Sequence, residues 1–365
     1  MTTTIDTKKA GLLALTIVLR CLLVLSTIVV LAFVGLCMTL NLVFNGPSES
    51  ARDVLTMSLL ESSAMKWVPA VFLGEETVAQ IRAKDTTPLP EDVSDVSQIV
   101  IDKNSSFSDE WKNYPDGIRI ETVYGSTYTA HVMLIRDPSS VYLATSTDKF
   151  DISIDGTRIH RQIETEGAIA AINAGAFNDD GTAQSYIGSL PIGMVVSEGK
   201  ILWDDGKSYD GFAGLTEDNI LVVANTINRT QVEELKIRDG CCFGPVLLMN
   251  GIVNDGVYNS NSGYNPRTAI GQRADGAIIF LCVDGRQAGS LGATHADLVN
   301  IMVEYGAVNA CNLDGGASTV MLYRDNYGRY GNAGDVVMLN SYSLLQEAPR
   351  KMPTFFMVRA AGSEE

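Results

Sequence analysis

Hydrophobic and polar positions follow three patterns along the chain, and the first is a continuous apolar run. The segment Cys21–Phe44 holds 24 residues without a charged side chain, and Arg20 separates it from a second apolar run, Gly11–Leu19. A run of this length is sufficient for a helix across the hydrocarbon core of a membrane. Arg20 can extend its guanidinium toward the lipid headgroups. We therefore expect a transmembrane helix over 21–44. A cleaved signal peptide is the alternative, but the apolar region is too long and no small-x-small cleavage site stands out.

The second pattern, over 45–116, predicts an extracellular stalk and linker. Within "ESARDVLTMSLLESSAMKWVPAVF", Leu55, Leu59, Leu60 and Met65 recur near one face of a helix. The stretch "DTTPLPEDVSDVS" that follows is acidic and rich in proline, which is typical of a linker.

The third pattern begins near Gly117 and consists of short β-rich runs, such as "IRIETVYG", "YTAHVMLI" and "VYLATS". Later, "GAIIFLCVDGR" predicts a buried strand that ends at Asp284. The stretch "GATHADLVNIMVEYGA" predicts a helix that Thr294 and Asp297 cap, and "VNACNL" predicts a strand that ends at Asp314. A strand–helix–strand unit makes its two strands parallel. We expect an α+β fold, with a domain over 117–362 built on a mixed β-sheet that contains this unit.

Asp284 and Asp314 occupy matching positions at the carboxyl ends of the two predicted strands. Open α/β sheets bind ligands at these ends, and a glycine follows each acid, which leaves room beside it. The two strands lie ~5 Å apart if they are neighbours and ~10 Å apart if one strand intervenes. A single Asp-Gly of this kind is more often a turn or helix cap. Two at matching strand ends favour a functional site.

Six stretches in this order resemble the phosphodiester glycosidase family, the family of the lysosomal uncovering enzyme. They are "INAGAFN", "PIGMVVSEGKIL", "NPRTAIGQRADG", "VDGR", "GATHADLVNIMVEYGAVNACNLDGGASTVM" and "MPTFFMV". The resemblance covers about Gly117 to Val358 and implies hydrolysis of a glycosyl-1-phosphodiester. It implies four catalytic residues, namely Asp314, Asp284, Arg267 and Arg286. It implies substrate binding by Asn173, Gly175, Thr268, Gly285, Gly315, Gly316, Ser318 and Thr319.

The chain departs from the family pattern at two positions. Ala174 and Ala317 each replace a usual glycine and add one methyl group. These departures put the identity of the substrate in doubt. They also sustain a second hypothesis, in which a degenerate pocket binds sugar phosphate in the cell envelope without cleaving it. A third hypothesis is a transglycosylase that uses the same chemistry with a sugar acceptor.

The expected chemistry is consistent with these residue types. A phosphate monoester has a second pKa of ~6 and leaves readily as a dianion. Either arginine can stabilise the charge that develops on the phosphate. A carboxylate must then stabilise the oxocarbenium-like sugar or activate water. We expect no cofactor and no metal, because the three histidines are scattered and the cysteines show no metal-binding spacing.

Charge sets the expected location and partners. Lys8, Lys9 and Arg20 precede the apolar segment, which predicts a single-pass protein with 1–20 in the cytoplasm and the catalytic domain outside. The net charge of the whole chain is −16. This argues against nucleic acid as a partner and leaves a carbohydrate phosphodiester and the membrane as the expected ones. The sequence does not determine the oligomeric state.

Two cysteines in the predicted parallel strands raise the question of a disulfide. Cys282 lies two residues before Asp284, whereas Cys311 lies three residues before Asp314. If both acids face one site, alternation along the strands places the two cysteines on opposite faces of the sheet. We therefore expect both to be free, buried thiols.

Overall fold

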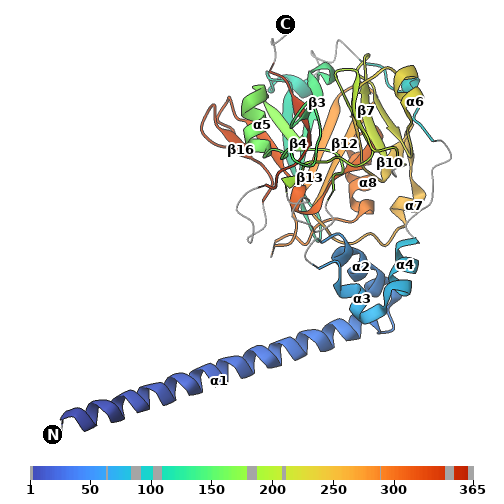
Figure 1. Ribbon diagram of the computed structural model, residues 1–365. Coiled ribbons are helices and arrows are strands. Elements are labelled where there is room, and N and C mark those ends of the chain that lie inside the picture. Colours follow the sequence, from blue (N-terminus) through green and yellow to red (C-terminus); the bar gives the residue numbers. More distant parts are fainter. Residues whose placement is uncertain are drawn as a thin grey trace.

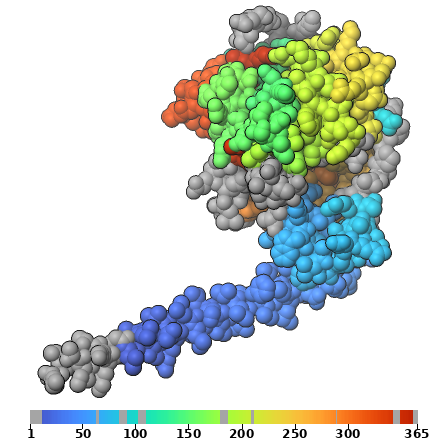
Figure 2. Space-filling view, in the orientation of Figure 1, coloured from blue at the N-terminus to red at the C-terminus, as the bar shows by residue number. Residues whose placement is uncertain are grey.

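The apolar start of the chain forms a single helix that projects from the remainder of the molecule (Figures 1 and 2). The computed structural model describes residues 3–62, 65–83, 92–101, 109–178, 187–207, 211–287, 289–341 and 349–360. Helix α1 (Thr3–Phe44) is continuous through Arg20 and begins well before Cys21. Its segment Leu12–Phe44 is long and apolar enough to cross a membrane, and none of its most apolar window is buried inside the protein.

Three short helices connect α1 to the β-rich domain. They are α2 (Glu49–Leu60), α3 (Val68–Leu73) and α4 (Glu75–Ala83). The Ser48 side chain caps α2 by accepting a hydrogen bond from the Ala51 backbone N–H. Phe44 at the end of α1 is buried and stacks on Phe72 of α3, with ring centroids 5.2 Å apart. The stalk is therefore a packed helical unit, which lies beneath the domain in Figure 1.

Part of the predicted linker packs on the domain. Ser94 is buried, and its backbone N–H donates to the Val223 carbonyl. Val93 forms an isolated bridge with Ala224, and Trp111 is also buried. Residues before Gly117 thus contribute to the core of the domain.

The domain contains three antiparallel sheets. The seven-stranded sheet has the order β1 (Ile118–Tyr124), β2 (Thr129–Ile135), β13 (Ile278–Val283), β12 (Arg267–Arg273), β14 (Ala307–Leu313), β10 (Val246–Met249) and β11 (Ile252–Val253). One five-stranded sheet has the order β16 (Val336–Met338), β15 (Met321–Arg324), β4 (Ala170–Asn173), β17 (Thr354–Val358) and β3 (Val141–Thr145). The other has the order β6 (Lys200–Asp204), β5 (Met194–Ser197), β9 (Ile237–Cys242), β7 (Phe212–Thr216) and β8 (Leu221–Ala224).

The three sheets share one central core, and helices cover their outer faces. Ile270, Phe356 and Val195, one from each sheet, belong to the same buried cluster. Apolar residues of α8 (His295–Glu304) pack on the outer face of the seven-stranded sheet. In the same way α5 (Ile159–Glu166) and α6 (Arg229–Glu234) each cover a five-stranded sheet. A last short helix, α7 (Asp255–Tyr258), follows β11.

The predicted strand–helix–strand unit is present as β13, α8 and β14, and Thr294 and Asp297 form the predicted capping box. The two strands run in the same direction because each pairs antiparallel with β12, which lies between them. The second of the two expected spacings, with one intervening strand, is therefore the correct one.

Cys282 and Cys311 are free and buried, as predicted, but the expected reason is wrong. Both side chains lie in the central core, on the same face of the sheet. Cys282 and Leu313 both oppose Thr268, so Asp314 is level with Val283 and not with Asp284. Strand β12 separates the two cysteines by ~10 Å, which is too far for a disulfide.

Candidate active site

The start of β12 and the ends of β13 and β14 bring three of the six family motifs to one edge of the seven-stranded sheet. They are "NPRTAIGQRADG", "VDGR" and the motif that ends in "NLDGGASTVM". The turn after Asp314 packs against the start of β12, where the Gly316 N–H donates to the Pro266 carbonyl at 2.8 Å. A Cβ atom at Gly315 would lie 2.7 Å from the same carbonyl oxygen, and one at Gly285 would lie 2.8 Å from the Pro266 ring. These two glycines therefore allow three backbone segments to meet.

Arg267 lies at the centre of this edge and is only 4% exposed. Its guanidinium donates to the carbonyls of Ala293 at 2.8 Å and Gly263 at 2.9 Å. A third contact, at 2.8 Å, joins it to His295 Nε2. Because arginine has no acceptor, Nε2 accepts this bond and the imidazole carries its proton on Nδ1. Burial, and then the charge of Arg267, hold the pKa of His295 well below its usual value, so the ring stays neutral.

Arg286 lies beside Arg267 on the loop after β13. It adopts a left-handed backbone conformation with φ 57°, which is costly for a residue with a side chain. Its Nη2 donates to Asn265 Oδ1 at 3.1 Å and to the Glu61 carbonyl at 3.4 Å. Burial lowers the pKa of Arg286; the Glu61 carboxylate opposes this effect and Arg267 adds to it. Arg267 is buried and Arg286 is exposed, yet the two guanidinium groups are close enough for the charge of Arg267 to lower the pKa of Arg286.

The stalk supplies the carboxylate for this pair of arginines. Glu61, directly after α2, forms an ion pair with Arg267 at 3.3 Å, and its side chain is 32% exposed. Ser58 Oγ accepts a hydrogen bond from the Tyr264 N–H at 2.9 Å, and a Cβ at Gly263 would lie 2.1 Å from the Ser58 nitrogen. The sequence analysis missed this contact because 206 residues separate Glu61 from Arg267.

The Asp284 carboxylate contacts a different set of residues from the two arginines. It is buried, and its Oδ1 accepts a hydrogen bond from the Ser341 N–H at 2.8 Å. His131 Nε2 lies 3.4 Å from the same oxygen and makes no hydrogen bond. Within the part of the chain that the structure describes, no hydrogen bond or ion pair joins Asp284 to either arginine. The sequence analysis set His131 aside because no other histidine is near it in the sequence.

Asp314 is half-buried at the end of β14, and its backbone is held firmly. Its N–H donates to the Ala174 carbonyl at 3.0 Å, and its carbonyl accepts a hydrogen bond from Asn173 Nδ2. Asn173 Oδ1 also accepts bonds from Thr268 Oγ1 at 2.7 Å and from the Val320 N–H at 3.1 Å. Asn173 and Thr268 are both fully buried, so this geometry favours a role in positioning the Asp314 turn.

The remaining predicted binding residues lie around the same turn. Gly175 is buried, and its N–H donates to Thr354 Oγ1 at 3.0 Å. Ser318 and Thr319 are buried after the glycine turn. The additional methyl of Ala174 lies in the central core, where it does not narrow a pocket.

Buried polar atoms without partners gather at this edge of the sheet. Six such side-chain atoms occur among the described residues. Four of them belong to residues at or next to the motif segments, namely His131 Nε2, Asn265 Nδ2, Asn312 Oδ1 and Thr319 Oγ1. Because an unpaired buried polar atom is costly, such a concentration is typical of a site that completes its hydrogen bonds with a ligand or water.

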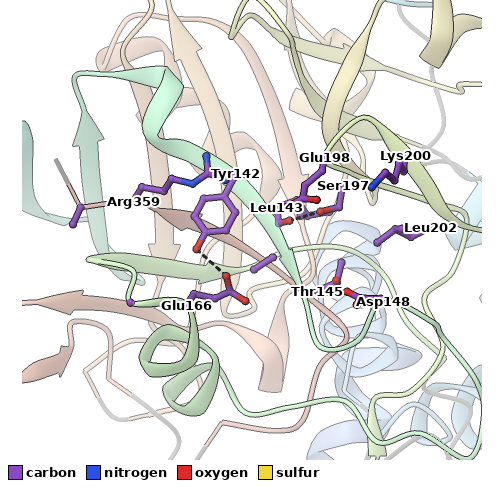
Figure 3. A pocket seen from close by; sticks show the side chains of 13 residues that line it. Tyr142, Leu143, Thr145, Asp148, Glu166, Ser197, Glu198, Lys200, Leu202 and Arg359 are labelled. Carbon is purple, nitrogen blue, oxygen red and sulfur yellow. Dashed lines mark hydrogen bonds between the residues drawn. The ribbon is translucent and has the colours of Figure 1, made fainter. Parts of the chain in front are cut away.

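A separate cavity of about 580 Å³ lies between β3 and the β5–β6 hairpin (Figure 3). Arg359 lies 4.2 Å from the centre of the Tyr142 ring, and the Tyr142 hydroxyl is 3.5 Å from Glu166. None of the predicted site residues lines this cavity. Its volume alone does not identify it as the active site.

Comparison with known proteins decides the family. The chain matches the phosphodiester glycosidase family over residues 166–359, which is more than half of its length. The chain belongs to the phosphodiester glycosidase family. The match includes every predicted site residue, from Asn173 to Thr319.

Two similar proteins accompany this family match, one by sequence and one by fold. The prophage-derived uncharacterized protein YomE of Bacillus subtilis (strain 168) is 26% identical over 201 residues, which cover 52% of this chain and 28% of that protein. The catalytic domain of zebrafish N-acetylglucosamine-1-phosphodiester alpha-N-acetylglucosaminidase, auto-inhibited by its pro-peptide, shares 18% identity with a TM-score of 0.51. This match covers 68% of this chain and 85% of the zebrafish chain. It establishes the phosphodiester glycosidase fold.

Family and fold together support a glycosidase-type hydrolase. Among the described residues, no group of three or more His, Cys, Asp and Glu side chains is arranged to hold a metal ion. Metal-free hydrolysis remains a prediction. Loss of turnover in EDTA that calcium restores would contradict it.

Proposed function

We propose that this protein is a membrane-anchored hydrolase of a glycosyl-1-phosphodiester in the cell envelope. The observation that carries the proposal is the pair of neighbouring arginines, Arg267 and Arg286, at the strand ends where the family motifs meet. Each guanidinium group can bind phosphate oxygens through two parallel N–H donors, so two adjacent groups are suited to hold one phosphate. Teichoic-type or capsular polymers are the proposed substrate class.

The arginines hold the phosphate and stabilise the charge that develops on it when the C1–O bond breaks. The leaving phosphomonoester has a second pKa of ~6, so it needs little protonation. The glycine turn contributes less than expected, because the Gly316 amide already donates to Pro266. Side chains therefore supply most of the charge stabilisation.

Asp314 is the proposed carboxylate at the anomeric carbon. It follows a buried strand, and Asn173 and Ala174 fix its backbone. Asp284, with His131 3.4 Å away, is the proposed acceptor of the proton from the attacking water. Different roles for the two acids are consistent with the register, which places Asp314 level with Val283 and not with Asp284.

Turnover of a defined substrate by the full-length protein in detergent tests the proposal. We expect a sugar-1-(methyl phosphate) to yield free sugar and methyl phosphate. Binding without turnover would support the scaffold hypothesis, and a new glycoside would support the transglycosylase. Absence of both binding and turnover across a panel of sugars would reject a sugar phosphodiester as the ligand.

The proposed location places the domain outside the cell with 1–20 in the cytoplasm. Lys8, Lys9 and Arg20 precede or interrupt the apolar part of α1, and such charges favour the cytoplasmic side. Protease added to intact cells should digest the domain and leave the N-terminus intact. Protection of the domain would reverse the proposed orientation.

A further inference from the structure

Asn265 is a buried residue with an unused hydrogen-bond donor beside the arginine pair. Its side chain is 1% exposed, and Nδ2 lacks a partner. Within the described residues, Asn265 is the one arginine-contacting residue of this edge whose side-chain amide nitrogen is unpaired. Asn265 is the first residue of the motif "NPRTAIGQRADG", and the family resemblance implies no role for it.

The orientation of this amide is fixed. Arg286 Nη2 donates to Oδ1 at 3.1 Å, and because arginine carries only donors, oxygen must occupy that side of the amide. The backbone cannot readily turn either. Asn265 exchanges two hydrogen bonds with Ala293, at 3.2 and 3.0 Å, and a Cβ at Gly292 would lie within 2.6 Å of the Asn265 backbone. The position of Nδ2 is therefore fixed, and its two N–H groups have no acceptor among the described residues.

The surroundings indicate which acceptor is missing. Asn265 lies two residues before Arg267 and bonds to Arg286, so the local field attracts an anion. An anionic oxygen accepts from Nδ2 and from a guanidinium together, and these charge-assisted bonds are the stronger kind. Both Glu61 contacts are long: its partly exposed carboxylate lies 3.3 Å from Arg267, and its backbone carbonyl lies 3.4 Å from Arg286. A ligand can replace the carboxylate contact most easily.

We infer that Asn265 Nδ2 donates a hydrogen bond to a non-bridging phosphoryl oxygen of the substrate. This inference rests on the proposed function, because it names a phosphate as the ligand between Arg267 and Arg286. Asn265 is then a substrate-binding residue that distinguishes a phosphodiester from an uncharged glycoside. Nδ2 is enclosed in this structure, so the phosphate reaches it when the neighbouring Glu61 contacts open.

The variant Asn265→Asp tests this inference. It retains an oxygen for Arg286 and replaces the donor with a second oxygen, which repels phosphate. We expect KM for the sugar-1-(methyl phosphate) to rise at least 10-fold, with kcat changed by less than about 3-fold. A matched control is Asn326→Asp, which adds the same charge at an exposed position and should leave KM unchanged.

Stabilisation by inorganic phosphate supplies a second measurement. We expect phosphate to raise the melting temperature of the wild-type protein and of Asn326→Asp but not of Asn265→Asp. An unchanged KM together with an unchanged phosphate effect would overturn the inference and indicate that an ordered water satisfies Nδ2. If the wild-type protein turns over no diester but the phosphate effect still depends on Asn265, the contact stands and the proposed hydrolase activity fails. If Asn265→Asp does not fold, Asn265→Ser, which keeps a donor, should restore most of the phosphate effect.

Discussion

The strand-end site and the cavity of Figure 3 differ in the hydrogen bonding of their polar side chains. The cavity is spacious, but its charged groups are exposed or paired, as Arg359 is with the Tyr142 ring. The strand-end site, formed by Arg267, Arg286, Asn265 and the turn after Asp314, combines buried Arg267 with exposed Arg286 and contains several buried polar atoms without partners. Volume therefore reports where a protein is loosely packed. Buried polar atoms without partners beside charged residues are the better criterion for a candidate ligand site.

The largest expected effect separates the two regions directly. Asp314→Asn keeps the shape of the side chain and removes its charge, so turnover should fall ~10²-fold or more while folding is unchanged. The matched change in the cavity, Asp148→Asn, should leave turnover intact. Steady-state kinetics and thermal melts measure both. If Asp314→Asn is instead less stable by ~1 kcal/mol and fully active, Asp314 is a structural cap.

Arg286→Lys should raise KM by about 10-fold. Lysine keeps the charge but loses the planar pair of donors that matches a phosphate. The control is Arg359→Lys in the cavity, where we expect no change in KM. If Arg286→Lys and Arg359→Lys changed KM equally, the strand-end site could not be distinguished from the cavity as the substrate-binding region.

Glu61→Gln should lower KM by about 3-fold, because the substrate phosphate and the Glu61 carboxylate compete for Arg267. Glu166→Gln makes the same change in the cavity and should have no effect on KM. A fall in kcat for Glu61→Gln would contradict competition and assign a direct catalytic role to this carboxylate.

The last expected effect concerns stability and not turnover: a pH dependence of unfolding at the strand-end site. Burial lowers the pKa of His295 in the folded state, so the unfolded chain binds a proton that the folded chain does not. The stabilising contribution is complete above the unfolded pKa of ~6.5 and is lost as the pH falls below it, by up to about 1.4 kcal/mol per pH unit. His295→Gln should flatten this part of the profile in denaturant titrations. An identical slope in the variant would show that other groups cause the loss.

Local patterns predicted the parts of this site that depend on neighbouring residues. The apolar run before Asp314 predicted β14, and Thr294 with Asp297 predicted the start of α8. These features follow from capping and periodicity within a few residues. The sequence alone also led to the strand ends as the place where the motifs meet.

Local sequence patterns did not predict which charged residues from distant segments contact one another at the site. The insertion of β12 between β13 and β14 shifted Asp314 out of step with Asp284. Glu61 reaches Arg267 from a helix in the predicted stalk, and His131 reaches Asp284 from the neighbouring strand. Each depends on how distant segments pair, which no local periodicity specifies.

The contact between Glu61 and Arg267 also decides where the chain can be cut to make a soluble protein. The sequence suggests a boundary near Gly117, but a fragment that starts there leaves buried Arg267 without the carboxylate that this structure gives it. A boundary just before Ser48 keeps the cap of α2, the Ser58 contact and Glu61. Recombinant proteins made at these two boundaries would differ in the charge of the candidate site, although both would carry every family motif.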